Sequence, residues 1–474
     1  MTEGLCRRAA SWLLIAALTG CTMAPTYHRP DLPTASVYPA EGQPGQGSVK
    51  ATTLGWRSFF QDPRLKALIA AALRNNRDLK AAVARIEEAR GQYRVQRADL
   101  LPEVDATGSA VKSHGQSSYG AGTGTGAGAT TLTRYEAGAS VTNFELDFWG
   151  RVRSLSKAAR LNYLATVEAE RAFRISLIAD VASAYLSLQA ADERISRAEA
   201  TVESRKQGLD IAELRRKAGV TSALDYRQAE TLLTQAQTEL ASLRRSRATL
   251  ANQLDVLVGG PIGAPLPNGL PLAKQGLTGE LGAGLPSDLL LNRPDIMEAE
   301  DQLRAANANI GAARAAFFPR ITLTGSAGYQ STELAQGVGT DGLTWSLGPA
   351  SATLPIFDFG RNQGNLDAAK ARKTIAVADY EKAIQDAFRE VADALAARRY
   401  LADQVEAQER ALAAQRESAE LAQLRYRNGV SSYLEVLDAE RNLFDAEQSL
   451  VEDRRSQLDN LVTLYVALGG GLTE

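Results

Sequence analysis

The chain has very little of the residues that most redox and metal sites require. Its 474 residues include only two histidines, two cysteines and three methionines, which argues against a redox centre or a histidine-rich metal site. Lysine plus arginine number 53 against 55 aspartates plus glutamates, so a polybasic nucleic-acid binder is excluded as well. After residue 20 no run of 18 apolar residues occurs, which excludes a multi-span helical transporter.

The first twenty residues have the layout of a secretory signal peptide. Arg7 and Arg8 precede the apolar stretch Ala9–Leu18, and the sequence Leu18-Thr19-Gly20-Cys21 follows. This segment resembles a bacterial lipoprotein signal, which implies cleavage before Cys21 and acylation of that cysteine, including by palmitate. The alternative is an ordinary signal peptide with a cysteine nearby. Cys21 is the only cysteine after residue 20, so no intramolecular disulfide is expected.

The chain contains an internal repeat. Gly219–Asp225 matches Gly429–Glu435 at a separation of 210 residues, whereas Leu101-Pro102 matches Phe318-Pro319 at a separation of 217. The length difference therefore lies upstream of Gly150, in an interval that contains the Gly/Ser/Thr/Ala run from 115 to 128. That run predicts an exposed flexible loop. Its glycines lack the spacing and the lysine of a nucleotide-binding loop, so a nucleotide role is not expected.

The sequence of each repeat predicts one long helix flanked by two shorter ones. The intervals are free of proline or nearly so and rich in Ala, Leu, Arg and Glu, which are strong helix formers. A helix of 68 residues is about 100 Å long, so two shorter helices end to end match one long one. Apolar stripes along the helices predict coiled-coil packing. The predicted helices are 64–101, 151–218, 221–258, 295–318, 361–428 and 431–468.

Between the helices the pattern changes to the alternation of β-strands. Apolar and small polar residues alternate over 321–330, which is the length of a tilted membrane strand, and further strands are predicted at 343–347, 104–110 and 135–141. A bilayer does not tolerate the open edges of a four-stranded sheet, so several chains would pool their strands, and three chains would supply twelve. The alternative is a soluble sheet packed on the helices.

Several motifs together resemble one family. The chain is similar to the outer-membrane efflux proteins, a TolC-like family, and to its lipoprotein branch in particular. The resemblance covers essentially the whole mature chain. It is carried by Tyr27-His28-Arg29-Pro30, by Glu145–Arg151, by Leu290–Ile296 with Ala299-Glu300, by Phe317-Phe318-Pro319 and by Leu437–Arg441.

The resemblance implies an α+β membrane protein that forms a homotrimer. The expected trimer has a twelve-stranded β-barrel with four strands from each chain, a long α-helical periplasmic barrel and an equatorial domain. Such a trimer lies in the outer membrane, is lipid-anchored and extends into the periplasm. It docks on a periplasmic adaptor and an inner-membrane pump, of RND type, and exports drugs or other small toxic compounds.

On this basis the chain divides into two repeats with flanking segments. The expected parts are a signal peptide (1–20), an extended segment (21–63), a first repeat (64–260, hairpin about 102–149), an equatorial linker (261–294), a second repeat (295–470, hairpin about 319–359) and a tail (471–474).

Two groups of residues are candidate functional sites. Leu434, Asp438 and Arg441 share one helix face at spacings i, i+4 and i+7, and the family resemblance places a periplasmic gate there. Gln228 stands where Asp438 maps in the first repeat. The alternative for Asp438 and Arg441 is an ordinary surface pair. The hairpin tips, which are expected to contact the adaptor, are Gly219, Val220, Gly429 and Val430.

No catalytic residues, cofactor or metal are expected. Acidic and basic residues on alanine-rich periodic helices more often form a solvated face than an acid–base pair. A lipid-anchored coiled-coil spacer of the cell envelope is the alternative function. It would not need strand hairpins between the helices of both repeats.

Overall fold

The computed structural model describes residues 22–39, 49–116, 129–261, 265–277, 281–282, 286–331, 342–348 and 350–473. The signal peptide, Cys21 and residues 117–128 of the predicted loop lie outside this part of the chain. The chain forms two compact units, and each draws on both repeats. Unit 1 comprises Met1–Pro30, Ile86–Thr166 and Ala299–Asp379, and unit 2 comprises Asp31–Arg85, Val167–Glu298 and Tyr380–Glu474.

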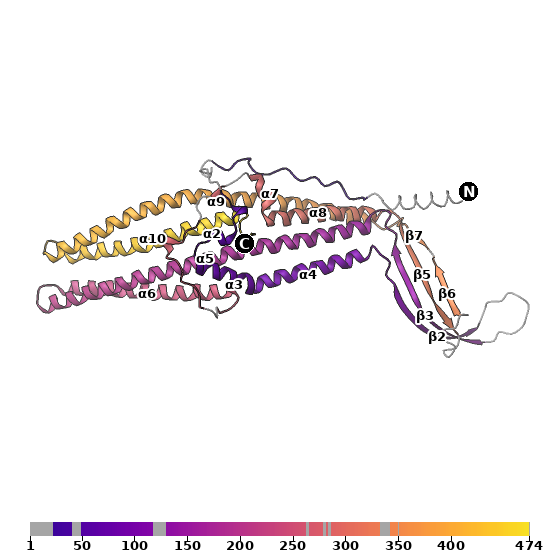
Figure 1. Cartoon of the computed structure of the whole chain (residues 1–474), viewed down its shortest axis with the longest axis horizontal. Helices are drawn as coiled ribbons and strands as arrows, with labels where there is room; N and C mark the ends of the chain where they lie inside the picture. The colour runs from indigo at the N-terminus through magenta and orange to yellow at the C-terminus, as the bar shows by residue number, and fades with distance from the viewer. Residues whose placement is uncertain are drawn as a thin grey trace, which may run out of the picture. The chain divides into compact units, whose positions relative to one another are not determined.

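The long helices lie where the sequence predicts them. Helices α5 (Arg151–Lys217) and α9 (Arg361–Arg427) have 67 residues each, and α6 (Ala223–Val258) and α10 (Tyr433–Ala467) return antiparallel to them (Figure 1). In unit 2 the α5–α6 hairpin and the α9–α10 hairpin pack through small clusters of aliphatic side chains rather than one broad core. The predicted lengths of these four helices and the two predicted helix hairpins are therefore confirmed.

The prediction of a single helix over 64–101 is wrong. The structure has α3 (Pro63–Asn75) and α4 (Arg77–Ala98), because Asn76 adopts a non-helical backbone and its side-chain oxygen accepts a hydrogen bond from the amide of Leu79 at 2.8 Å. In the second repeat, α7 (Leu289–Asn292) and α8 (Pro294–Ala315) are likewise separated, at Arg293. Proline at the first position of α8 starts a helix well, because it needs no amide partner there.

A glycine approaches the broken helix in both repeats. A Cβ atom on Gly259 would lie 2.4 Å from the carbonyl oxygen of Asn75, and a Cβ on Gly469 would lie 2.8 Å from that of Asn292. Both glycines have positive φ, at 90° and 81°. Asn75 and Asn292 correspond at the upstream repeat offset, and Gly259 and Gly469 at the downstream one, so the same backbone contact is built twice.

The sheet of unit 1 is antiparallel, in the order β2-β3-β5-β6. Its strands are β2 (Asp105–Gln116), β3 (Ala129–Glu145), β5 (Arg320–Ser331), β6 (Leu343–Leu347) and β7 (Ser351–Thr353). The strand predicted at 343–347 is β6, and β7 is a further short strand that was not predicted; both pair with β5. Gly348, between them, has φ 110°, a value incompatible with a continuous strand.

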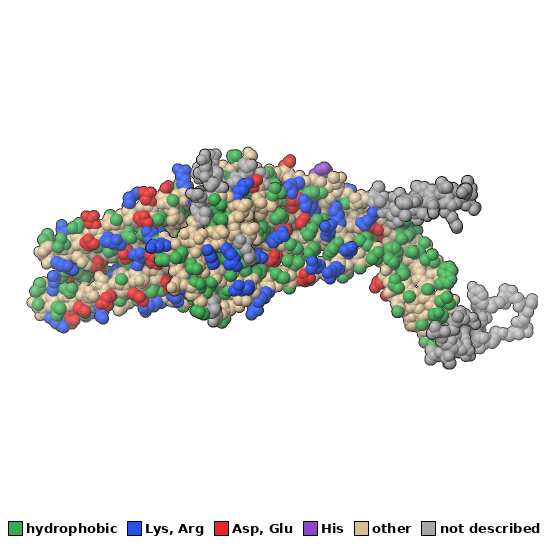
Figure 2. Space-filling model, viewed as in Figure 1, with side chains coloured by type: hydrophobic (Ala, Val, Ile, Leu, Met, Phe, Trp, Pro, Cys, Tyr) green, Lys and Arg blue, Asp and Glu red, His purple; other side chains and the backbone are tan. Residues whose placement is uncertain are grey.

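The two faces of this sheet differ in chemistry. On one face Ala327 lies opposite Trp345 and Tyr329 opposite Leu343, whereas on the other Ser326 and Ser346 exchange a hydroxyl hydrogen bond of 2.8 Å. The described part of the chain leaves these apolar side chains uncovered, since Trp345 is 75% exposed, and hydrophobic side chains cover much of the sheet in Figure 2. Among the described residues, no helix combines the length and the apolar character needed to cross a membrane.

Unit 2 also contains short elements around the buried carboxylate of Asp62. This side chain caps α3, accepting from the amide of Arg64 at 2.7 Å, and it also accepts from the Tyr185 hydroxyl and the Leu270 amide at 2.8 Å. It thereby joins α3, α5 and the segment between the repeats. The short elements are β1 (Val49–Lys50), η2 (Ala51–Thr53), α2 (Trp56–Phe59), η3 (Leu272–Lys274), β4 (Leu281–Gly282) and η4 (Pro286–Asp288).

In unit 1 the N-terminal segment is fastened to α8 by Glu300. Its carboxylate accepts two hydrogen bonds from Arg29, at 3.0 and 2.6 Å, and one from the hydroxyl of Tyr27 at 3.0 Å. Arg304 adds an ion pair of 2.7 Å. The motif Tyr27-His28-Arg29-Pro30 therefore has a structural role in holding the segment that follows Cys21.

Candidate functional site

The two helix hairpins end in nearly identical glycine turns. The amide of Gly219 donates to the carbonyl of Arg216 at 3.0 Å and the amide of Val220 to that of Arg215 at 2.9 Å, which is the Schellman pattern. Gly429 and Val430 make the same two bonds, and the φ angles of the two glycines are 70° and 72°. Both glycines therefore cap the C-terminal ends of α5 and α9.

The residue after each glycine points away from its hairpin. Val220 is 74% exposed and Val430 is 68% exposed. Aliphatic side chains at the extreme ends of two hairpins are available to a partner, although single exposed valines are common on protein surfaces. The contact with an adaptor remains a prediction.

The first turns of the returning helices differ. Ser222 and Asp225 form a capping box at the start of α6, and the hydroxyl of Thr221 donates to the same carboxylate at 2.5 Å. The hydrogen bond from Thr221 holds the pKa of Asp225 below its usual range. Ser432, at the matching position before α10, makes no side-chain capping bond. Asp225 therefore has a local structural role.

The predicted gate residues lie together on an uncovered face of α10. Asp438 and Arg441 form an ion pair of 3.3 Å, with both side chains more than half exposed, and Leu434 is 52% exposed. Val436, on the opposite face, is buried, and so is Leu437 at the border of the exposed face. The three residues thus share one exposed face, and the ion pair within one chain has the geometry of the alternative, an ordinary surface pair, while gating remains a prediction.

Aromatic residues near the tips link the two hairpins, which the sequence did not indicate. The guanidinium of Arg215 on α5 lies 4.6 Å from the ring centroid of Tyr426 on α9, within the range of a cation–π interaction. Tyr426 in turn lies 5.0 Å from the ring of Tyr433 on α10. Burial and the charge of Glu440 raise the pKa of Tyr433 to about 12.

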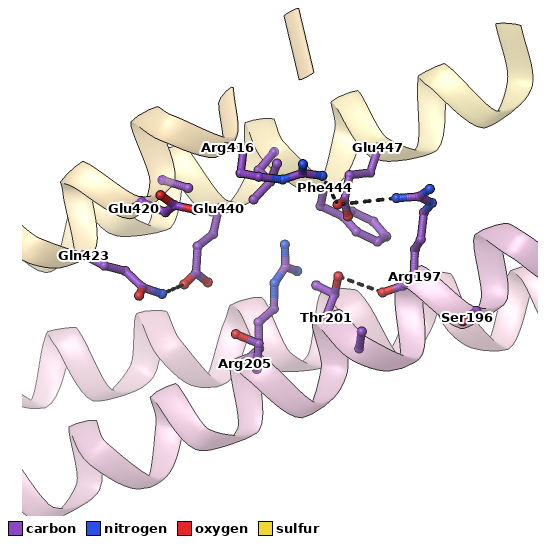
Figure 3. Close-up of a pocket in the computed structure, with 14 residues that line it drawn as sticks. Ser196, Arg197, Thr201, Arg205, Arg416, Glu420, Gln423, Glu440, Phe444 and Glu447 are labelled. Carbon is purple, nitrogen blue, oxygen red and sulfur yellow. Dashed lines mark hydrogen bonds and ion pairs between the residues drawn. The ribbon is translucent and has the colours of Figure 1, made fainter. Parts of the chain in front are cut away.

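A cavity of about 550 Å³ lies in unit 2 between α5, α9 and α10. Figure 3 shows its charged lining, with Arg197 and Arg205 from α5 directed toward side chains of α9 and α10. Glu447 forms ion pairs with Arg197 at 3.6 Å and with Arg416 at 3.7 Å. Glu440 accepts a hydrogen bond from the amide of Gln423 at 2.9 Å.

Arg205 is the exceptional group in this lining. It is only 5% exposed, and its Nη1 donates to the carbonyl of Leu232 at 3.0 Å. Its Nε and Nη2 have no hydrogen-bond partner in the described part of the chain. Burial lowers the pKa of this guanidinium, although it stays charged at any physiological pH. Periodicity cannot identify such a residue, because an arginine in a helix is usually exposed.

Within the described residues, no cluster of histidine, cysteine, aspartate and glutamate is suited to hold a metal ion. Cys21, the predicted lipidation site, lies outside these residues.

Comparison with known proteins gives consistent matches along the chain. The model of the outer membrane efflux protein family matches residues 68–260 and 285–470. The solvent efflux pump outer membrane protein SrpC of Pseudomonas putida is 44% identical over 458 residues, which cover 96% of each chain. The cation efflux system protein CusC of Escherichia coli (strain K12) is 41% identical over 460 residues, covering 96% of this chain and 97% of CusC.

A solved structure of an outer membrane channel is also similar to this chain. The crystal structure of the open state of the MtrE outer membrane channel of Neisseria gonorrhoeae has a TM-score of 0.86 to this chain at 41% identity. The match covers 96% of this chain and 99% of MtrE.

Proposed function

The chain belongs to the outer membrane efflux protein family and is an outer-membrane efflux channel, and we propose that it is the passive exit duct of a tripartite pump. In this proposal a periplasmic adaptor and an inner-membrane pump, of RND type, deliver the cargo, and the chain itself performs no catalysis. The observation that carries the proposal is the duplicated helix hairpin with its exposed valine tip, joined in each repeat to strands with one apolar face. A coiled-coil spacer would have no use for such strands.

The repeat supports a trimer with a closed ring of contacts. Within one chain, Trp149 of the first repeat stacks on Phe318 of the second, with ring centroids 4.7 Å apart, and donates to the Pro319 carbonyl at 2.9 Å. The repeat offsets map Trp149 onto Phe359 and Phe318 onto Leu101. Phe359 is fully exposed and Leu101 is 72% exposed. A second copy of the chain would pair them.

The backbone of Phe359 adds to this argument. Its φ is 54°, in the left-handed region that residues other than Gly, Asn and Asp seldom adopt. A contact with another chain would account for both the strained backbone and the full exposure of this aromatic residue. In a ring of three copies, the second repeat of each chain would then contact the first repeat of its neighbour. Strands β6 and β7 of each chain would lie next to β2 of that neighbour. The resulting twelve-stranded barrel leaves no open strand edge.

We further propose that Cys21 is acylated and anchors the chain in the outer membrane. The hydrogen bonds of Tyr27 and Arg29 to Glu300 support this proposal, since they hold the segment that follows Cys21 against α8. Cys21→Ser should abolish incorporation of labelled palmitate. Unchanged labelling would refute the assignment.

The duct is tested by electrophysiology on the purified full chain. We expect particles with the mass of three chains in mild detergent, and discrete conductance steps in planar bilayers. A stable monomer, or a trimer that never conducts, would contradict the proposal. The names of the two relatives indicate different exported compounds, solvents for one and cations for the other. The exported compound is therefore best identified by measuring how susceptible a deletion strain is to a panel of solvents and cations.

A further inference from the structure

Arg205 places a buried positive charge beside a cavity large enough for a small molecule. Its side chain is 95% buried, and two of its three nitrogens have no hydrogen-bond partner among the described residues. A buried arginine is normally matched by a carboxylate or by carbonyl oxygens, because an unpaired buried charge is costly. Here the protein supplies one hydrogen-bond acceptor, the carbonyl of Leu232, whereas the carboxylates of Glu440 and Asp445 act on the guanidinium only through their charge. The cavity of about 550 Å³ is within the usual range for small-molecule sites.

Four of the other five charged groups of the cavity already have partners in the described chain. Glu447 is shared by Arg197 and Arg416, and Glu440 is bonded to the amide of Gln423. Three arginines and three glutamates line the cavity, the sixth of these groups being Glu420. The lining is therefore neutral as a whole. A ligand with one negative charge fits it, whereas a dianion would be repelled by the glutamates.

The remaining wall is apolar and aromatic. The ring centroid of Phe444 lies 5.5 Å from the Arg205 guanidinium, and Leu443, Ala200 and Ala419 complete the lining around it. An apolar body next to a carboxylate would contact this wall, and a small shift of the Arg205 side chain would bring its Nε and Nη2, which are buried in the ligand-free chain, onto the carboxylate. These two donors lie side by side on the guanidinium and match the two oxygens of a carboxylate.

We propose that the cavity between α5, α9 and α10 binds a small apolar monocarboxylate, held by Arg205 and packed on Phe444. A free molecule fits this position better than an acidic side chain of a partner protein, because the guanidinium is nearly inaccessible from the surface. The site is new relative to the proposed duct, since it needs neither the pore nor the exposed tips.

Such a ligand would connect the two hairpins. Arg205 belongs to α5, and Phe444 belongs to α10 one turn after Arg441, so an occupied cavity bridges the first hairpin to the helix that carries Asp438 and Arg441. Occupancy would then resist separation of the hairpins, and export could respond to the concentration of organic acids around the protein.

The test uses the full-length protein in lipid nanodiscs and isothermal titration calorimetry. The probe is 2-naphthoate, with 2-naphthalenemethanol as its neutral analogue and 2-naphthyl phosphate as its dianionic one. We expect saturable binding of naphthoate alone. Arg205→Gln should weaken it at least about tenfold, because a hydrogen-bonded charge pair is lost. Arg244→Gln is the matched control. Arg244 lies on α6 in an exposed ion pair with Glu199, so naphthoate binding should be unchanged.

Thermal unfolding provides a second readout. If Arg205 waits for a ligand, Arg205→Gln should leave the ligand-free protein as stable as the wild type or more stable, while naphthoate should stabilise only the wild type. The proposal is overturned if naphthoate does not bind, if the alcohol binds equally well, or if Arg205→Gln destabilises the ligand-free protein and leaves binding unchanged. Loss of adaptor cross-linking in Arg205→Gln, without naphthoate binding to the wild type, would assign the cavity to an acidic partner side chain instead.

Discussion

The guanidinium of Arg215 lies 4.6 Å from the ring centroid of Tyr426 and thereby joins two hairpins that are about 210 residues apart in sequence. Both residues lie within the last turns of their helices, and each helix then ends in the same glycine turn. A bond at this position limits how far the two tips can separate. If the tips move during export, this cation–π pair opens first.

Tyr426→Leu should therefore loosen the two hairpins. The expected loss is about 0.5–1 kcal/mol, the usual value of an exposed cation–π pair. We predict a higher single-channel conductance in planar bilayers, with the trimer intact. Tyr226→Leu is the control, because Arg216 and Arg227 contact that ring within the first hairpin alone. Equal conductance of both variants and the wild type would argue against a restraint at Tyr426.

Removal of the Asp438–Arg441 pair tests the gate. If the exposed face of α10 lines a constriction, the double variant Asp438→Ala and Arg441→Ala should raise conductance and admit large antibiotics. A pair with only a surface role contributes a few tenths of a kcal/mol and would change neither. Glu406→Ala with Arg410→Ala removes a still more exposed pair of 2.6 Å on α9 and should leave conductance unchanged.

A charge at either hairpin tip should weaken the contact with the adaptor. Val220→Asp or Val430→Asp places a carboxylate where an exposed aliphatic side chain now stands, so it costs the folded hairpin little. We expect less cross-linking to the adaptor and an unchanged trimer mass. Leu424→Asp, on an exposed position of α9 before the turn, controls for added charge. Loss of the trimer would give these valines a structural role instead.

Cysteines at Phe359 and Leu101 should connect neighbouring chains. With a short bismaleimide we expect the double variant to give dimers and trimers on denaturing gels, since the two side chains would be in contact across the interface of the proposed ring. Each single variant should remain monomeric on the same gel. Phe359→Cys with Val95→Cys, whose site on α4 is equally exposed, should react far less. Equal yields would contradict the proposed ring.

Acid should release the N-terminal segment. Burial raises the pKa of Glu300, but hydrogen bonding from Arg29 and the charge of Arg304 outweigh it, so the pKa is lowered overall. A carboxylate with a lowered pKa stabilises the fold above its unfolded pKa of about 4.3, and this contribution is lost as the pH falls through the folded pKa. Glu300→Gln should cause the same release at neutral pH, measured as faster proteolysis between residues 22 and 39. Glu298→Gln is the neighbouring control.

The sequence predicted the long helices to within two residues, because their ends carry strong local signals such as Gly219 and Gly429. It missed the break at Asn76, whose side chain caps α4 locally and also donates to the carbonyl of Leu257, about 180 residues away. The tip and gate residues follow from local spacing. Arg205 and Tyr426 do not, since their roles depend on which side chains the second hairpin brings against the first.

Because the glycine contact occurs twice in each chain, one copy can serve as an internal control for the other. Gly259 meets Asn75, and Gly469 meets Asn292, in the same geometry but with different neighbours beyond. Alanine at one glycine strains one half of the molecule and leaves the other as an unaltered copy. A comparison of the stabilities of the two single variants would show whether the fold depends equally on the two copies of this contact.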